Sequence, residues 1–439
     1  MSASWQHHIG GAFAAPAGGE TLAEIDPRSG EASFRIARGN AADVEHAVTA
    51  AAAALDGWRA TKALDRGRVL TRIAAAIRVD AEALARIEQV ETGKPLPQAR
   101  IDIEMTAQYF EFYGGLAPSI EGETIDIGPG KLCYTLREPY GVIGVITPWN
   151  APINQAARAA APALAGGNTV VLKPSEFTSV SSLRLAEIAT ECGLPAGALN
   201  VVTGTGLEVG APLVDHPGIA KIAFTGSLRA GREIGIKAAQ RILPVTLELG
   251  GKSPDLVFAD ADLEAAAHGA ARGFTVNAGQ ACIAGTRIYV EASVRDRFVA
   301  LLKAAVEQLS VGAGDDAQVG PIITEPQFRK VHEYFEIARA EGAEVVTGAL
   351  ARDAAGFFVA PTVLAGLPQD SRVVREEIFG PLCAVLTFET EAEAIRLAND
   401  SDYGLAAGLW TQNLARAYRG AARLQAGEGY VNTQPSGAG

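Results

Sequence analysis

The sequence has few cysteines and no run of basic residues. Only four of its 439 residues are cysteine, at positions 133, 192, 282 and 383, and none belongs to a CxxC pair. This pattern excludes a disulfide scaffold and a paired-cysteine zinc site, and it favours a reducing compartment. The net charge of −12 makes nucleic acid and anionic membrane poor partners.

Leader-like and membrane-spanning segments are also lacking. The start, MSASWQHHIGG, has neither a basic n-region nor an apolar core, so no signal peptide is predicted. The longest apolar stretch, from residue 140 to 167, is interrupted by Pro148, Asn150, Pro152 and Arg158. We therefore expect a cytoplasmic protein with no membrane or nucleic-acid partner and no metal site.

The 439 residues exceed the size of one hydrophobic core, which predicts two large domains. The first 40 residues read as an arm with short extended pieces. Alanine-rich helical patterns fill residues 41–115, and GETIDIGPGKLCYTLREP predicts a hairpin around Gly128 and Gly130.

Strands and helices then alternate. GVIGVIT, TVVLKP, LNVVTG, KIAFTG and VTLELGG are β-prone runs separated by helical patterns, and a second series from DLVFAD to EGYVN follows Gly251. Such alternation predicts an α/β fold with two Rossmann-like open sheets, whose ligands lie at the carboxyl ends of parallel strands.

Cys282 is the first candidate for chemistry. It lies between Ala281 and Ile283, after a helical pattern and before a predicted strand, so small neighbours leave room for a carbonyl. The alternative is an inert buried cysteine, the usual role of an isolated one. None of the six histidines is a persuasive base for a cysteine hydrolase.

Two polar residues at strand ends are further candidates. Glu248 ends the apolar run VTLE, where a carboxylate must be paired, neutralised or exposed to a cleft. It could serve as a general base, or it could face water on an edge strand. Asn150, in VITPWNAP, could donate to an oxyanion or cap the next helix.

Other segments suit a dinucleotide. The turn at Gly226, followed by Gly231 at the start of a helix, is placed to receive a pyrophosphate, although the pattern by itself is weak. Lys173 and Glu176 suit ribose hydroxyls, and EEIFGP offers Glu377 and an aromatic ring, Phe379.

Together, PWN, KPSE, FTGS, LELGGK, GQ-x-C, EEIFGP and YGL occur in an order that resembles the aldehyde dehydrogenase superfamily, from Leu22 to Asn432. The resemblance implies a Cys282 nucleophile, a Glu248 general base and an Asn150 oxyanion donor. It implies NAD as cofactor, with NADP as the alternative; Glu176 favours NAD because a carboxylate repels a 2′-phosphate. The implied cofactor-binding residues are Ile146, Thr147, Trp149, Lys173, Glu176, Gly206, Gly210, Phe224, Gly226, Ser227, Gly231, Leu249, Glu377 and Phe379.

The implied reaction oxidises a small aldehyde to a carboxylate through a Cys282 thiohemiacetal and thioester. An acyl-CoA-forming enzyme is the close alternative, and Glu248 argues against it because thiolysis needs no activated water. A cofactor-independent thiol hydrolase and a catalytically silent assembly protein are the rivals from other classes. The expected substrate pocket contains Ala151, Gln155, Arg158, Ala281 and Ile283; Arg158 suits a carboxylated aldehyde, or it is a structural charge.

The implied organisation is a cofactor-binding domain of residues 1–120 and 140–248, an oligomerisation hairpin of residues 121–139 and a catalytic domain of residues 249–432. Family members continue beyond the strand matched by EGYVN, so residues 433–439 are expected to be a truncated tail, and the shortened chain to be weakly active. The full-length form is expected to be a homodimer or homotetramer.

Overall fold

The computed structural model describes residues 4–348 and 356–433. These residues form two compact units. The first comprises the chain up to Ile25, residues 32–91 and residues 99–248; the second comprises residues 26–31, residues 92–98 and the chain from Leu249. The expected tail lies outside the described residues except for Thr433.

The first unit begins with short strands and continues with helices. The strands are β1 (Ser4–Trp5), β2 (His7–Ile9), β3 (Ala12–Ala14), β4 (Thr21–Asp26) and β5 (Glu31–Ala37). The helices are α1 (Ala41–Ala60), α2 (Ala63–Val79), α3 (Ala81–Thr92) and α4 (Leu96–Leu116). Asn40 starts α1 with a capping box, because its side chain accepts from Ala42 N–H while Asp43 accepts from the Asn40 N–H. The predicted short extended pieces and the predicted helical segment are present, although β2 and β3 join the central sheet of the unit and do not form a separate arm.

A seven-stranded sheet forms the centre of the first unit, in the order β12-β11-β8-β9-β10-β2-β3. All five predicted strands are present and mutually parallel: β8 (Val142–Ile146), β9 (Thr169–Lys173), β10 (Leu199–Val201), β11 (Ile219–Thr225) and β12 (Val245–Glu248). The connecting helices are α5 (Pro152–Ala165), α6 (Val180–Glu191), α7 (Ala211–Asp215) and α8 (Leu228–Gln240). The strand order reverses between β8 and β11, which makes their carboxyl ends the crevice of a doubly wound sheet.

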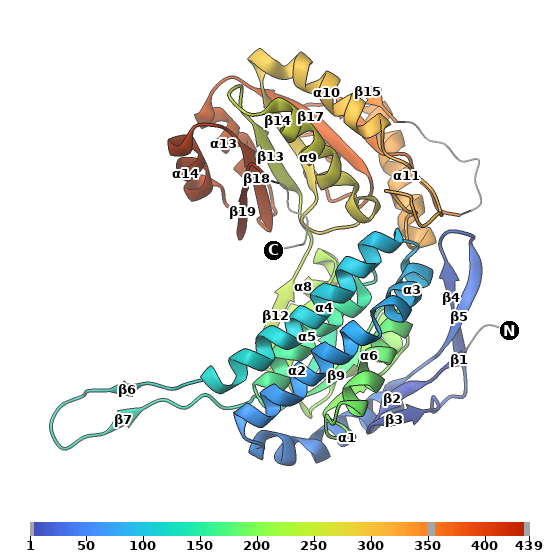
Figure 1. The fold of residues 1–439 in the computed structure, drawn as a ribbon, viewed down its shortest axis with the longest axis vertical. Coiled ribbons are helices and arrows are strands. Elements are labelled where there is room, and N and C mark those ends of the chain that lie inside the picture. The colour runs from blue at the N-terminus through green and yellow to red at the C-terminus, as the bar shows by residue number, and fades with distance from the viewer. Residues whose placement is uncertain (1–3, 349–355, 434–439) are drawn as a thin grey trace. The chain divides into compact units, whose positions relative to one another are not determined.

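The predicted hairpin is also present. Strands β6 (Thr124–Ile125) and β7 (Cys133–Tyr134) pair in antiparallel register and project from the helices of their unit (Figure 1). The hairpin exposes large apolar side chains, namely Ile125, Ile127, Leu132, Tyr134 and Leu136. Exposed apolar side chains in such number are typical of surfaces that pack against another molecule.

The second unit contains another seven-stranded sheet, in the order β15-β16-β17-β14-β13-β18-β19. Its strands are β13 (Ser253–Val257), β14 (Gly285–Glu291), β15 (Glu344–Thr347), β16 (Thr362–Ala365), β17 (Leu382–Phe388), β18 (Ala406–Trp410) and β19 (Glu428–Val431), and only β15 is antiparallel to its neighbour. The run GFFVAPTVL is strand only from Thr362. The Phe357 backbone instead bonds to Pro27 and Ile322, and Pro361 has no N–H to donate to a ladder.

Helices bury both faces of this sheet. They are α9 (Leu263–Thr275), α10 (Arg295–Glu307), α11 (Glu325–Ala340), α12 (Arg372–Arg375), α13 (Glu391–Asn399) and α14 (Leu414–Arg423). Neighbouring residues of a strand enter opposite cores: Val257 packs with Phe274 of α9, whereas Leu256 packs with Tyr334 of α11. The prediction of two open-sheet α/β units is confirmed.

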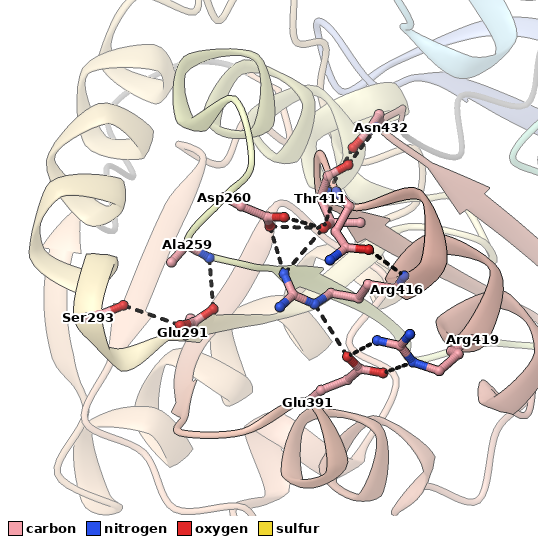
Figure 2. Close-up of polar contacts among 10 residues, drawn as sticks. Ala259, Asp260, Glu291, Ser293, Glu391, Thr411, Arg416, Arg419 and Asn432 are labelled. Atoms are coloured by element: carbon pink, nitrogen blue, oxygen red, sulfur yellow. Dashed lines mark hydrogen bonds and ion pairs between the residues drawn. The ribbon is translucent and has the colours of Figure 1, made fainter.

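A polar network covers the carboxyl edge of the second sheet at β13 and β18, where the strand order reverses (Figure 2). Asp260 accepts hydrogen bonds from Thr411 Oγ1 at 2.9 Å and from Arg416 Nη1 at 2.8 Å. Arg419 pairs with Glu391 at 2.7 Å. The side chains at this edge bond to one another.

Candidate active site

Asn150 lies in the loop between β8 and α5 of the first unit. Helix α5 takes Ala151, and not Asn150, as its N-cap residue. The loop is held by Thr178, whose hydroxyl donates to the Trp149 carbonyl at 3.2 Å. Asn150 thus belongs to a loop at the carboxyl edge of the first sheet.

Glu248 ends the edge strand β12 and forms an ion pair. The Arg158 Nη2 lies 3.2 Å from the Glu248 Oε2, and each side chain is 37% exposed. Arg158 also donates to Gln155 at 3.5 Å. The predicted base and two predicted substrate residues therefore lie together, and Glu248 has a cationic partner that the sequence did not reveal.

The Gly226 turn lies beside Glu248. The Gly226 N–H donates to the Glu248 carbonyl at 3.0 Å, and Ser227 caps α8 by accepting from the Ala230 N–H at 3.3 Å. A Cβ at Gly226 would lie 2.6 Å from the Phe224 Cζ, so a larger residue at this position would have to displace the Phe224 ring. The turn leads into the amino terminus of a helix, where the backbone N–H groups favour an anion.

Lys173 and Glu176 form a second polar pair at the carboxyl edge of the first sheet. The Lys173 Nζ lies 3.0 Å from Glu176, and the lysine is buried. Burial lowers the pKa of Lys173, and the Glu176 carboxylate opposes that shift. Thr147 donates its backbone N–H to the Lys173 carbonyl at 3.1 Å, while its buried hydroxyl has no hydrogen-bond partner among the described residues. An ammonium, a carboxylate and a buried hydroxyl are donors and acceptors that fit a nucleoside.

The other predicted cofactor residues of the first unit surround this edge. Ile146 ends β8 and Phe224 lies near the end of β11, both buried, while Gly206 and Gly210 bound a single π-helical turn after β10. Gly231 is buried in the first turn of α8.

Cys282 lies in a turn before β14, at the amino edge of the second sheet. The residue and its neighbours Ala281 and Ile283 are half-buried. A side chain at Gly251 would lie 2.2 Å from the Cys282 carbonyl oxygen, so the two backbones pass in direct contact. The predicted turn, and the small residues around the thiol, are present.

Glu377 lies against the same glycines. The Gly251 N–H donates to its Oε1 at 3.0 Å, and the Lys330 Nζ donates to its backbone carbonyl at 2.8 Å. Burial raises the pKa of Glu377, partly offset by the Gly251 hydrogen bond. Cys282, Glu377 and Leu249, which precedes the glycines, therefore share one region of the second unit.

The sequence and the fold of this chain both match those of known proteins. A sequence model of the aldehyde dehydrogenase family matches residues 13–438. The structure resembles that of a putative aldehyde dehydrogenase from Burkholderia cenocepacia, with 41% sequence identity, a TM-score of 0.96, and coverage of 98% of this chain and 90% of that chain. The chain belongs to the aldehyde dehydrogenase family.

Two further aldehyde dehydrogenases are similarly close. The NAD-dependent aldehyde dehydrogenase from Sinorhizobium meliloti has 41% identity and a TM-score of 0.97, with 98% of this chain and 87% of that chain covered. An aldehyde dehydrogenase from Bacillus cereus, solved as its NAD+ complex, has 38% identity and a TM-score of 0.96, with 98% and 89% covered. The aldehyde dehydrogenase resemblance inferred from the ordered segments is confirmed.

Sequence reasoning missed three residues near Glu377 in this family member. Burial, with a smaller contribution from Arg287, lowers the pKa of Lys252 to about 7. Gln327 donates to the carbonyls of Ile378 and Phe379 at 2.7 Å and 2.9 Å. A lysine directly after the glycine pair was a visible signal for Lys252, whereas Gln327 and Lys330 lie far along the chain and had none.

Among the described residues, no helix is long and apolar enough to cross a bilayer. The same residues contain no cluster of histidine, cysteine and carboxylate side chains suited to a metal ion.

Proposed function

We propose that this chain oxidises an aldehyde to a carboxylate with NAD, through a covalent intermediate on Cys282. The observation that carries the proposal is the meeting of Cys282 and Glu377 at Gly250 and Gly251, in a chain of the aldehyde dehydrogenase family. Small residues around the thiol leave it accessible to a carbonyl carbon, which a cysteine buried only for packing does not need.

The first step is addition. The Cys282 thiolate attacks the aldehyde carbon, a C–S bond forms, and the carbonyl oxygen becomes an oxyanion of the thiohemiacetal. We assign stabilisation of this charge to the Asn150 amide and the Cys282 backbone N–H, because fixed donors stabilise a developing oxyanion at no cost in reorganisation. Loss of one such donor typically costs about 2.7–4 kcal/mol in the barrier.

NAD, when bound, supplies the acceptor for the hydride that leaves this carbon. We assign its adenosine ribose to Lys173 and Glu176, its phosphates to the Gly226–Ser227 turn and its nicotinamide side to Glu377 and Phe379. The buried Thr147 hydroxyl and the α8 amino terminus support this assignment.

The last step is hydrolysis. Glu248 takes a proton from water, the water oxygen attacks the thioester carbon, and the C–S bond breaks to return the thiol and release the carboxylate. The Arg158 guanidinium balances the charge of Glu248 at 3.2 Å and fixes the direction of its carboxylate. Arg158, with Gln155, Ala151, Ala281 and Ile283, is our proposed substrate-contacting set, and its charge favours a carboxylated aldehyde.

From these roles we propose that residues 1–120 and 140–248 form the cofactor-binding domain and that residues 249–432 form the catalytic domain. The apolar hairpin of residues 121–139 is proposed to join copies into a homodimer or homotetramer, which sedimentation of the purified chain tests directly.

The test of function is a panel of aldehydes followed by NADH absorbance. Neutral and carboxylated aldehydes are compared with NAD, with NADP and with no cofactor, each in the presence and absence of coenzyme A. We expect NAD-dependent turnover that coenzyme A does not accelerate. Turnover of an ester without cofactor, together with no aldehyde oxidation, would replace the proposal with a thiol hydrolase.

A further inference from the structure

The backbone just before Cys282 has an uncommon conformation. Asn277, Ala278 and Gly279 are all left-handed, with φ angles of 50°, 53° and 73°. Residues with a Cβ avoid this region because the Cβ approaches the following carbonyl oxygen, and only glycine adopts it freely. Ala278 is buried, so surrounding protein must hold it there.

The Gln280 side chain supplies this support. It is fully buried, and its Nε2 donates to the Asn277 carbonyl at 2.8 Å and to the Pro321 carbonyl at 3.2 Å. Its Oε1 accepts from the Ile323 N–H at 2.8 Å. The Gln280 amide therefore links the left-handed turn to the segment at residues 321–323, because its nitrogen donates to Pro321 and its oxygen accepts from Ile323.

Other contacts close the turn around this amide. The Asn277 N–H donates to the Gln98 Oε1 at 3.0 Å. A side chain at Gly279 would lie 2.2 Å from the Gly380 carbonyl oxygen, so the turn passes directly against that backbone. Two residues after Gln280, the Cys282 backbone packs directly against the backbone of Gly251.

We propose that Gln280 is a positioning residue for Cys282. By holding the left-handed turn, it sets the direction of the Cys282 sulfur and of the Cys282 backbone N–H two residues later. This inference rests on the proposed function, because it takes Cys282 as the nucleophile. It adds a specific requirement: a primary amide at residue 280, since no other side chain of similar size donates twice and accepts once.

Gln280→Glu is the most informative change because it preserves shape. A carboxyl group has at most one donor where the amide has two, so at least one of the hydrogen bonds donated to the carbonyls of Asn277 and Pro321 is lost. The matched control is Gln369→Glu in the same unit, where the amide donates to the Leu397 carbonyl at 3.1 Å and accepts from the Tyr289 hydroxyl at 2.9 Å.

The first measurement needs neither substrate nor cofactor. The rate of Cys282 alkylation by iodoacetamide is followed by peptide mass spectrometry, with Cys192 in the same chain as reference. We expect Gln280→Glu to alter the Cys282 rate by about tenfold while Cys192 stays unchanged, because reorientation of the thiol changes its exposure and the surrounding dipoles that favour the reactive thiolate. Gln369→Glu should leave the Cys282 rate at the wild-type value even where it lowers Tm.

A second variant separates positioning from general support of the fold. Ala278→Gly removes the conformational penalty of the turn without removing a hydrogen bond. The double variant Gln280→Ala/Ala278→Gly should therefore have a Cys282 alkylation rate closer to the wild-type value than Gln280→Ala alone has. It also keeps the test usable if Gln280→Glu is poorly folded. Gln280 variants that lower Tm but leave Cys282 alkylation unchanged, or an alkylation rate that Ala278→Gly does not restore, would overturn the proposal.

The burst of NADH in the first turnover gives the catalytic readout. Gln280→Glu should slow that burst about tenfold at saturating aldehyde, with KM changed much less, since the defect lies in the nucleophile. A wild-type chain that oxidises no aldehyde would defeat the proposed function while the alkylation comparison still decides the role of Gln280.

Discussion

The two sheets of this protein use opposite edges for their candidate functional residues. In the first sheet, Asn150, Lys173, Gly226 and Glu248 follow or end parallel strands, at the carboxyl edge. In the second sheet, Cys282 precedes β14 and Glu377 precedes β17, at the amino edge. The general expectation that ligands lie at carboxyl ends therefore holds for the ribose and phosphate residues proposed in the first sheet. It fails for Cys282 and for Glu377, which we assign to the nicotinamide side of the cofactor.

The physical reason lies in what each edge offers. Helices that follow parallel strands present their amino termini at the carboxyl edge, and the Gly226 turn before α8 is such a site for an anionic phosphate. In the second sheet the corresponding edge is closed by Asp260, Thr411 and Arg416 bonding to one another (Figure 2). Side chains that bond to one another in this way fill the crevice and leave no room for a ligand. Strand topology therefore identifies the candidate edges, and the side chains decide which edge can bind a ligand.

Removal of the thiol at the amino edge should have the largest effect. Cys282→Ala is expected to lower aldehyde oxidation by roughly 10⁴-fold or more, because no covalent intermediate can form. NAD binding, assigned mainly to the first sheet, should persist in a fluorescence titration. Substantial turnover in this variant would refute the nucleophile assignment and the contrast between the edges.

The next effect tests the carboxyl edge of the first sheet. Glu248→Gln should lower steady-state turnover by about 10²- to 10³-fold while the first-turnover burst of NADH remains, because the base is needed only for hydrolysis. Stopped-flow absorbance separates the two phases. Loss of the burst together with the steady state would mean that Glu248 acts before hydride transfer.

Arg158 should show a smaller and selective effect. Arg158→Ala is expected to raise the KM of a carboxylated aldehyde about tenfold relative to that of a neutral aldehyde of similar length, because one charged hydrogen-bonded contact is lost. Its ion pair with Glu248 predicts, in addition, a modest fall in kcat for both substrates. Equal changes in KM would assign Arg158 to positioning Glu248 alone.

Lys252, which precedes β13 at the amino edge of the second sheet, should make the stability of the protein depend on pH. Burial lowers the pKa of Lys252 to about 7, whereas an unfolded lysine titrates near about 10.4. Between these values the unfolded chain holds a proton that the folded chain has released. The contribution of Lys252 to the unfolding free energy therefore rises with pH, by at most about 1.4 kcal/mol per unit.

Urea denaturation of the wild type and of Lys252→Met measures this contribution. The stability of the wild type relative to the variant should increase from about pH 7 to about pH 10. Parallel pH profiles would show that the buried lysine keeps its proton throughout.

The smallest effect concerns the filled carboxyl edge of the second sheet. Arg416 pairs with Asp260 and lies 4.5 Å from the centre of the Phe258 ring. Arg416→Ala should lower the unfolding free energy by about 1–2 kcal/mol without changing turnover, because the network is structural. Arg229→Ala, which removes an exposed pair with Glu233, is the control and should cost less than about 0.5 kcal/mol. Loss of turnover in Arg416→Ala would indicate that this edge has a function.

The sequence by itself determined the alternation of strands and helices, the two open sheets and the family. Short β-branched runs between amphipathic helices are local patterns that a sequence shows directly. Cys282, in a turn between a helix and a strand, and Glu248, at a strand end, were identified from neighbouring residues in the same way. The strand predicted from Gly356 shortened to Thr362–Ala365 because ladder pairing, unlike propensity, requires an N–H that Pro361 lacks.

Only the tertiary structure decided which partners these residues have. Glu248 pairs with Arg158, which lies 90 residues earlier in the chain (248 − 158). Glu377 accepts a hydrogen bond from Gly251, which lies 126 residues earlier. The left-handed turn before Cys282 could not be inferred either, because Ala278 disfavours this conformation by itself. It exists because Gln280 reaches the segment at residues 321–323, and long-range hydrogen bonds of this kind outweigh the local preference of the backbone.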